Sequence, residues 1–175
     1  MNSVLNLNIT TPDLILFSLL LPLGGALIIL ATGKHRDLRE LVTFLTSSFL
    51  FVLILNIFHR LETGEIPTLI LYELFSGLEI SFTIEPLGMI FGLLASGLWI
   101  INSLYSIGYM RANNESNQTR FYVCFSLAIF SALGIAFSAN LLTFFLFYEL
   151  LTISTYPLVT HSGSSIAKKG GRIYL

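Results

Sequence analysis

The chain has 175 residues, of which 54% are hydrophobic and 11% charged, and its formal net charge at pH 7 is −1. Soluble domains carry about 25% charged residues. The composition therefore excludes a water-soluble enzyme, a nucleic-acid-binding domain and a disordered chain. It predicts an all-α integral membrane protein, whose first partner is the lipid bilayer. The single cysteine, Cys124, excludes an intrachain disulfide and a cysteine metal cluster.

Long uncharged runs predict where the chain crosses the membrane, because about 20 helical residues span the hydrocarbon layer. Phe121–Thr160 contains one charge, Glu149, and is long enough for two spans. The expected break is at Phe137-Ser-Ala-Asn140, where Asn140 or Ser138 would cap the next helix. The whole chain, 1–175, is read as one transmembrane domain, a five-helix bundle with spans at about 14–33, 41–58, 86–110, 121–138 and 141–160.

The residues between the second and third spans follow a different pattern. Apolar residues alternate with polar ones at Leu78, Ile80, Phe82 and Ile84. This period of two predicts a strand with one apolar face. The apolar segment Thr68–Phe75 precedes it, and Ser76-Gly77 is a turn pair. We expect a small β-hairpin at about 66–85 that lies outside the hydrocarbon, on the extracytoplasmic side.

The positions of Lys and Arg predict the orientation, because cytoplasmic loops are enriched in both residues. With five spans, Arg60 falls on one side. The other basic residues fall on the opposite side, namely Lys34, Arg36, Arg39, Arg111, Arg120, Lys168, Lys169 and Arg172. The basic side is therefore predicted to be cytoplasmic, with the N-terminus outside. We expect a multi-pass protein of a prokaryotic inner membrane.

The last residues change character twice. Ser162–Arg172 is polar and basic, and Ile173-Tyr174-Leu175 is apolar again. This pattern predicts a cytoplasmic loop followed by the opening of a sixth span, so we expect a chain truncated before that span. The alternative is a short complete protein that ends in a basic tail.

Glu149 lies near the middle of the predicted span 141–160. A carboxylate at the bilayer centre costs on the order of 3 kcal/mol on insertion scales. Such a group faces the bundle interior, pairs with a cation or stays protonated, and each of these suits a proton relay. The alternative is a neutral glutamic acid that forms a hydrogen bond to a neighbouring helix.

Polar residues follow Glu149 at helical spacing. Thr152, Tyr156 and Thr160 share one helical face with it, which predicts a proton path open to the cytoplasm. Pro157 is expected to kink the helix. His161 either relays protons at the cytoplasmic mouth or complements the helix C-terminus as a cation. No phosphate loop, His/Cys metal spacing or nucleophile elbow occurs, so no cofactor or metal is expected.

Asn140–Tyr156 resembles the fifth transmembrane helix of the proton-conducting antiporter-like subunits of complex I, Mrp-type Na+/H+ antiporters and membrane-bound hydrogenases. Leu104–Met110 resembles the end of their third helix, and Glu85-Pro-Leu-Gly88 resembles its beginning. Ala167–Leu175 is similar to the loop that enters their sixth helix. The resemblance covers essentially the whole chain, and Tyr156–His161 is closer to the Mrp D-subunit branch than to complex I.

The resemblance implies that Glu149 modulates the charge of a seventh-helix lysine, as one half of a Glu–Lys proton switch. Tyr148 stands where many family members have Trp, and the lysine would lie beyond Leu175. The implied function is the N-terminal part of a proton-translocating subunit, in cation/proton antiport or in a pump of the NADH:quinone oxidoreductase type. Its implied partners are other membrane subunits, protons and Na+.

Two other functions stay open. The chain could be a small, non-transporting scaffold subunit or a relic fragment of such a complex. It could also belong to a membrane enzyme that acts on quinone, although no set of redox residues is present. In each case we do not expect the chain to be a catalyst by itself.

Overall fold

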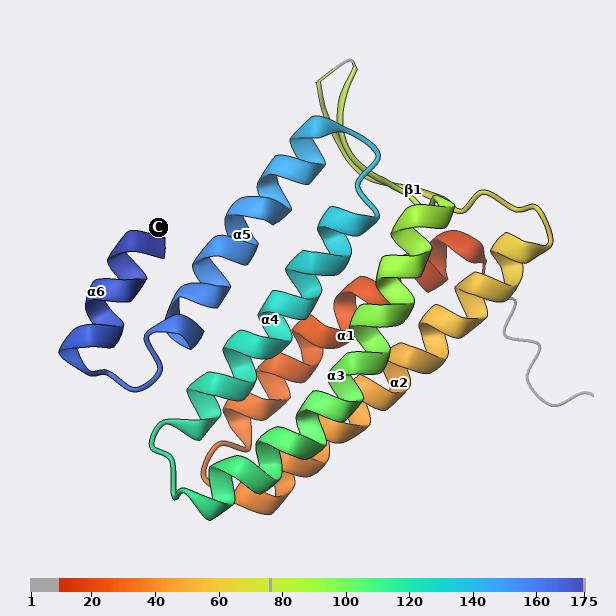
Figure 1. Ribbon diagram of the computed structural model, residues 1–175. Coiled ribbons are helices and arrows are strands. Elements are labelled where there is room, and N and C mark those ends of the chain that lie inside the picture. The colour runs from red at the N-terminus through yellow and green to blue at the C-terminus, as the bar shows by residue number, and fades with distance from the viewer. Residues whose placement is uncertain (1–9, 76, 175) are drawn as a thin grey trace, which may run out of the picture.

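The computed structural model describes residues 10–75 and 77–174, so Ser76 of the expected turn and Leu175 lie outside the described residues. The described part has six helices and two strands (Figure 1). The long helices are α1 (Thr11–Ala31), α2 (Arg36–Glu62), α3 (Pro86–Ala112), α4 (Gln118–Ala136) and α5 (Leu141–Val159). All five are long and apolar enough to cross a membrane. The predicted helical membrane fold with a small two-stranded sheet is confirmed.

The long helices pack side by side (Figure 1). Helix α1 packs against α2 and α4, and α3 packs against the same two helices, so these four form a bundle. The bundle buries Ile15 of α1, Ile54 of α2, Trp99 of α3 and Leu133 of α4. Helix α5 covers the outer side of α4, and α6 (Ser165–Tyr174) packs on α5. Helix α5 therefore lies at the edge of the described structure.

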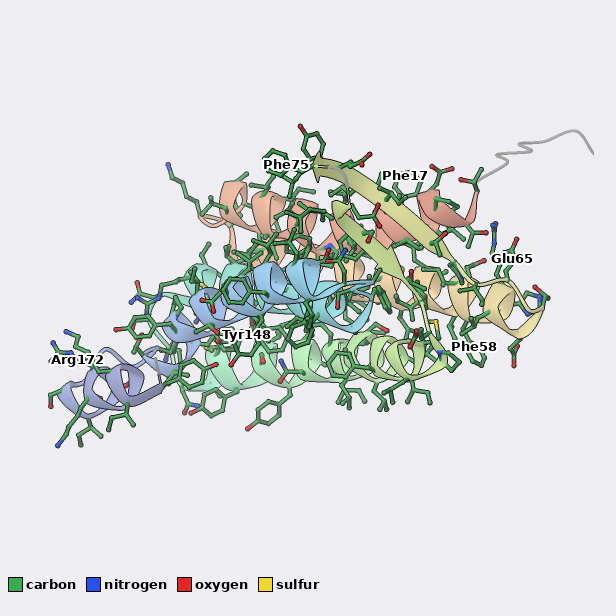
Figure 2. The ribbon with its side chains drawn as sticks, turned by 90° about the horizontal axis from the view of Figure 1, so that it is seen from above. Phe17, Phe58, Glu65, Phe75, Tyr148 and Arg172 are labelled. Atoms are coloured by element: carbon green, nitrogen blue, oxygen red, sulfur yellow. The ribbon has the colours of Figure 1, made fainter. Side chains whose placement is uncertain are left out.

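The hairpin has the predicted strands, β1 (Thr68–Phe75) and β2 (Leu78–Thr83), which pair antiparallel with two irregularities in register. Its far end projects beyond the helices, and Figure 2 shows Phe75 there. Phe82 and Ile84, near the bundle, are buried, whereas Leu78 is exposed. The apolar face predicted from the alternation is therefore buried only where helices lie beneath it.

The edge of β2 that faces away from β1 forms backbone hydrogen bonds with the connection between α4 and α5. The Thr83 amide donates to the Phe137 carbonyl at 2.8 Å, and the Ala139 amide donates to the Ser81 carbonyl at 3.0 Å. This pairing satisfies backbone groups that an edge strand would otherwise leave open. It also fixes the hairpin against the start of α5.

The end of the chain differs from the expected polar loop. Ser165–Tyr174 forms α6, a strongly amphipathic helix. Its start is stabilised by Ser164, whose Oγ accepts a hydrogen bond from the Ala167 amide at 3.1 Å. Gly171 packs closely on Thr160 and Tyr156 of α5. The prediction of a loop holds for 162–164 but was wrong for 165–172, because one face of this helix packs against α5, a contact that composition alone does not reveal.

The connections α1–α2, α3–α4 and α5–α6 lie at one end of the molecule (Figure 1). Figure 2 shows Arg172 of α6 at this end and Glu65, which follows α2, at the opposite end. The side of the membrane that each end faces stays a prediction.

Candidate functional site

The rotation of α5 about its axis is set by Phe147. The Phe147 ring lies edge-on to Phe82 of β2, at 5.5 Å between centroids, and to Phe130 of α4, at 5.2 Å. It fills the space above Gly134 of α4, where an added Cβ would overlap the ring. Edge-to-face aromatic contacts of this kind stabilise packing beyond the area that they bury. Phe147 therefore marks the face of α5 that points into the protein.

The start of α5 is fixed by a separate set of polar contacts. Asn140 caps the helix, as predicted, because its Oδ1 accepts a hydrogen bond from the Thr143 amide at 2.8 Å. The Asn140 amide nitrogen donates to the Glu79 carbonyl at 2.8 Å and to Ser81 Oγ at 3.0 Å. The Ser81 amide donates to Thr143 Oγ1 at 3.1 Å. Helix α5 is therefore anchored to the hairpin.

Glu149 lies on the outer face of α5. Two residues of helix correspond to a rotation of about 200°, so the inward position of Phe147 turns Glu149 outward. The Glu149 side chain is exposed and makes no hydrogen bond or ion pair with the described residues. Its neighbours on this face, Phe145 and Ile153, are 56% and 64% exposed. The carboxylate therefore does not face the interior of the described bundle.

Helix α5, which carries Glu149, is the least covered of the five long helices. In the apolar window of α5 only 11% of the residues are buried, against 28% to 44% in the other four helices. A carboxylate exposed to lipid at this depth would be costly. Another protein segment that covers this face would remove that cost.

The predicted path residues lie along the same helix, and α6 covers part of them. Tyr156 and Thr160 pack against Gly171 of α6. The Thr152 hydroxyl donates to the Tyr148 carbonyl at 3.1 Å, and the Thr160 hydroxyl donates to the Tyr156 carbonyl at 3.0 Å. These hydroxyl protons are used within α5, so each oxygen keeps only its acceptor capacity for a passing proton donor. The described contacts do not connect them to Glu149.

Pro157 and His161 lie at the far end of α5. Pro157 is inside the helix, two residues before its end at Val159. The His161 ring lies edge-on to Phe121 of α4, at 5.6 Å between centroids. Both of its ring nitrogens are buried without a hydrogen-bond partner among the described residues. His161 is therefore held by aromatic packing beside α4, where its backbone carbonyl accepts a hydrogen bond from Arg120 at 3.1 Å.

A second polar site, which the sequence analysis did not predict, lies at the basic end of the four-helix bundle. Arg39 and Glu40 of α2 are 5% and 3% exposed. Arg111 of α3 donates to Glu40 Oε2 from its Nε at 2.9 Å and also from a terminal nitrogen. That nitrogen bonds Asp37 as well. This cluster of Asp37, Arg39, Glu40 and Arg111, here called the charge cluster, ties α2 to α3.

Arg39 extends the charge cluster to α4. Its guanidinium donates to Thr119 Oγ1 at 3.0 Å and to Gln118 Oε1 at 2.6 Å, and it lies 5.3 Å from the centre of the Tyr122 ring. Helix α2 is therefore joined to α4 through Arg39 and to α3 through the neighbouring Glu40.

The sequence analysis missed this site because it began the second span at 41 and placed Arg39 in a loop. Helix α2 in fact begins at Arg36. A signal was available, since Arg39 and Glu40 lie four and three residues before Thr43 and so share its helical face.

The described residues contain no group of three or more His, Cys, Asp or Glu side chains that could hold a metal ion. The charged groups that stand out in the described structure are the carboxylate of Glu149 on α5 and the charge cluster between α2 and α3.

Known proteins similar in sequence are membrane subunits, and no family model matches the chain. The antiporter subunit mnhA2 of Staphylococcus haemolyticus is 29% identical over 168 residues, which cover 89% of this chain and 20% of that protein. The Na+/H+ antiporter subunit A1 of Staphylococcus aureus is 35% identical over 85 residues, covering 48% of this chain and 10% of that protein. Subunit 5 of the chloroplast NAD(P)H-quinone oxidoreductase of Anthoceros angustus is 37% identical over 82 residues, or 47% and 11% of the two chains.

The fold has a counterpart among solved structures. A chain of the membrane-bound sulfane sulfur reductase, an archaeal respiratory membrane complex, matches with a TM-score of 0.81 and 16% identity, over 91% of this chain and 33% of that chain. The present chain spans about a fifth of the length of the first curated relative. The antiporter relatives named here include A subunits, so the choice of the D-subunit branch stays a prediction. The resemblance itself is confirmed, because this chain is similar in sequence to subunits of Na+/H+ antiporters and of an NAD(P)H-quinone oxidoreductase.

Proposed function

We propose that this chain forms part of a proton-translocating antiporter-like subunit, in which Glu149 is the acidic half of a carboxylate–lysine switch. The observation that carries the proposal is the position of Glu149, exposed on the least covered of the five long helices and without a partner among the described residues. A cation on the surface that covers α5 would stabilise the charged carboxylate. Removing that cation would favour protonation of the carboxylate.

The protein surface that covers α5 would then control when Glu149 holds a proton. An approaching lysine lowers the proton affinity of the carboxylate, and a receding lysine raises it. Because Phe147 fixes the rotation of α5, the carboxylate keeps its position while the lysine moves. Thr152, Tyr156 and Thr160 would supply oxygen atoms along the route from Glu149 toward the basic end, with water molecules between them.

The names of similar proteins suggest two kinds of transport for the whole protein. Relatives named as Na+/H+ antiporter subunits favour cation/proton antiport, and a relative named as an NAD(P)H-quinone oxidoreductase subunit favours redox-driven proton pumping. Proton movement through a membrane subunit is common to both possibilities, and we propose that step for this chain. Partner membrane subunits would supply any electron transfer.

The experiment compares Glu149→Gln, Glu149→Asp and Glu73→Gln in the full-length protein, assembled with its partner subunits in proteoliposomes. The readout is proton movement reported by a pH-sensitive dye, driven by a Na+ gradient or by quinone reduction. Glu149→Gln keeps the shape but cannot ionise, so we expect proton movement to fall at least tenfold. Glu149→Asp should restore part of it, and Glu73→Gln, an exposed carboxylate in β1, is the matched control.

Two results would refute the assignment. Full activity of the assembled Glu149→Gln protein would show that the carboxylate is not needed. An equal loss in the Glu73→Gln control would show that the assay reports assembly. A complex that assembles but moves no protons in the unmodified form would instead favour the scaffold function.

A further inference from the structure

A polar cavity of about 310 Å³ lies at the basic end of the bundle, between the α1–α2 connection and the start of α4. Its lining includes Lys34, Arg36, Arg39, Gln118, Thr119 and Glu115. Lys34 and Arg36 are exposed and make no ion pair with the described residues. Three cations and one anion thus share a small space, and two of the cations are available to a ligand.

Arg39 is a buried and rigidly held part of the cavity lining. It is 5% exposed, and hydrogen bonds to Gln118 and Thr119 fix its terminal nitrogens. Its Nε has no hydrogen-bond partner among the described residues, although a buried guanidinium normally has every N–H paired. The nearest oxygen of Glu40 is 3.9 Å away, whereas Glu40 bonds Arg111 closely. The positive charge of Arg39 is therefore only partly compensated.

Two helices also begin at this cavity. Helix α2 begins at Arg36 and α4 at Gln118, and neither N-cap side chain, His35 or Asn117, accepts a hydrogen bond from the helix. The first N–H groups of a helix lack partners within it. Such groups, together with the helix dipole, favour an anion. The cations, the unpaired Arg39 Nε and two uncapped helix starts all point to the same kind of ligand.

We propose that this cavity binds a phosphate group, carried by the headgroup of an anionic phospholipid or by a soluble phosphate. Basic pockets at the ends of transmembrane helices are typical sites for anionic headgroups. Glu115 opposes the anion and is expected to moderate its affinity. The proposal is independent of Glu149, since the two sites lie on different helices.

The test uses the complete chain in phosphatidylcholine nanodiscs, titrated with phosphatidylglycerol and followed by native mass spectrometry of the retained lipid. Lys34→Ala/Arg36→Ala removes the two unpaired cations without touching the charge cluster. Each basic residue near an anionic surface strengthens binding about fivefold, so the loss of two should lower the affinity for phosphatidylglycerol about 30-fold. Lys168→Ala/Lys169→Ala on α6 removes the same charge elsewhere and should change the affinity at most about threefold.

A second arm identifies the source of the phosphate. Inorganic phosphate is added to the same variants in pure phosphatidylcholine nanodiscs, and the unfolding temperature is measured. Stabilisation of the unmodified chain that is lost in Lys34→Ala/Arg36→Ala supports a soluble phosphate, and lipid retention with the same dependence supports a headgroup. Equal losses in the two double variants, or no binding in either arm, would overturn the proposal.

Discussion

Replacing Glu40 by Gln should destabilise the junction of α2 and α3 far more than is usual for a charged residue near the end of an apolar run. Glu40 Oε2 accepts from Arg111, and its Oε1 lies 3.9 Å from a terminal nitrogen of Arg39. A Gln side chain of the same shape has one amide nitrogen, which must face one of these two arginines. The substitution therefore removes a charge and places a donor opposite a donor.

The magnitude follows from the burial of the partners. Removing one partner of a fully buried ion pair costs about 3–5 kcal/mol, and surface pairs contribute about 0–1 kcal/mol. The Glu40 side chain is 4% exposed and that of Arg39 is 6% exposed, but Arg111 is 46% exposed. Solvent therefore screens part of the loss, and we expect Glu40→Gln to lower the free energy of unfolding by about 2–3 kcal/mol.

The assay is reversible unfolding of the chain in mixed micelles of increasing SDS fraction, followed by circular dichroism. The matched control is Asp37→Asn, because Asp37 also bonds Arg111 but its side chain is 88% exposed. It should cost less than about 1 kcal/mol. Combining Glu40→Leu with Arg39→Met should cost less than the sum of the two single changes.

Equal effects of Glu40→Gln and Asp37→Asn would refute the reasoning, because burial would then not decide the strength of the charge cluster. Additive single changes at Glu40 and Arg39 would separately show that these two residues are not coupled.

Two further substitutions test what positions α5. Gly134→Ala places a Cβ against the Phe147 ring, and unfolding in the same assay should show a loss of about 1–3 kcal/mol. Gly24→Ala is its control, since nothing lies near an added Cβ there, and equal losses would contradict the packing argument. Asn140→Ala removes the cap of α5 and should lower its stability by about 1–2 kcal/mol, measured by faster hydrogen exchange in its first turn. Asn56→Ala, where the amide bonds only a carbonyl of its own helix, should leave exchange in α5 unchanged; faster exchange in both variants would refute the role of the cap.

The helical membrane architecture could be predicted from the sequence because it depends on local properties. An apolar run long enough to cross the bilayer forms a helix wherever it lies. The strands of the hairpin were predicted correctly because alternation with a period of two is a local pattern. The Asn140 cap was also predictable, since a capping side chain bonds amides of its own helix.

Local patterns did not reveal which residues face one another. The sequence predicted that Glu149 would lie on a polar helix face, but Phe147 and the space above Gly134 decide that this face points away from α4. The segment 165–174 was predicted as a loop, because its helix depends on contact with Tyr156 and Thr160. Both outcomes depend on residues from elements far apart in the sequence.

The sequence by itself determined the membrane class, the five long helices, the hairpin strands and the isolated carboxylate of Glu149. Only the tertiary structure decided that Arg39 and Glu40 are buried and that Arg111, distant in the chain, bonds Glu40. The physical reason is that helix formation in lipid satisfies backbone groups within each segment. Burial of a charge instead requires partners on other helices, and their positions are fixed only when the helices pack.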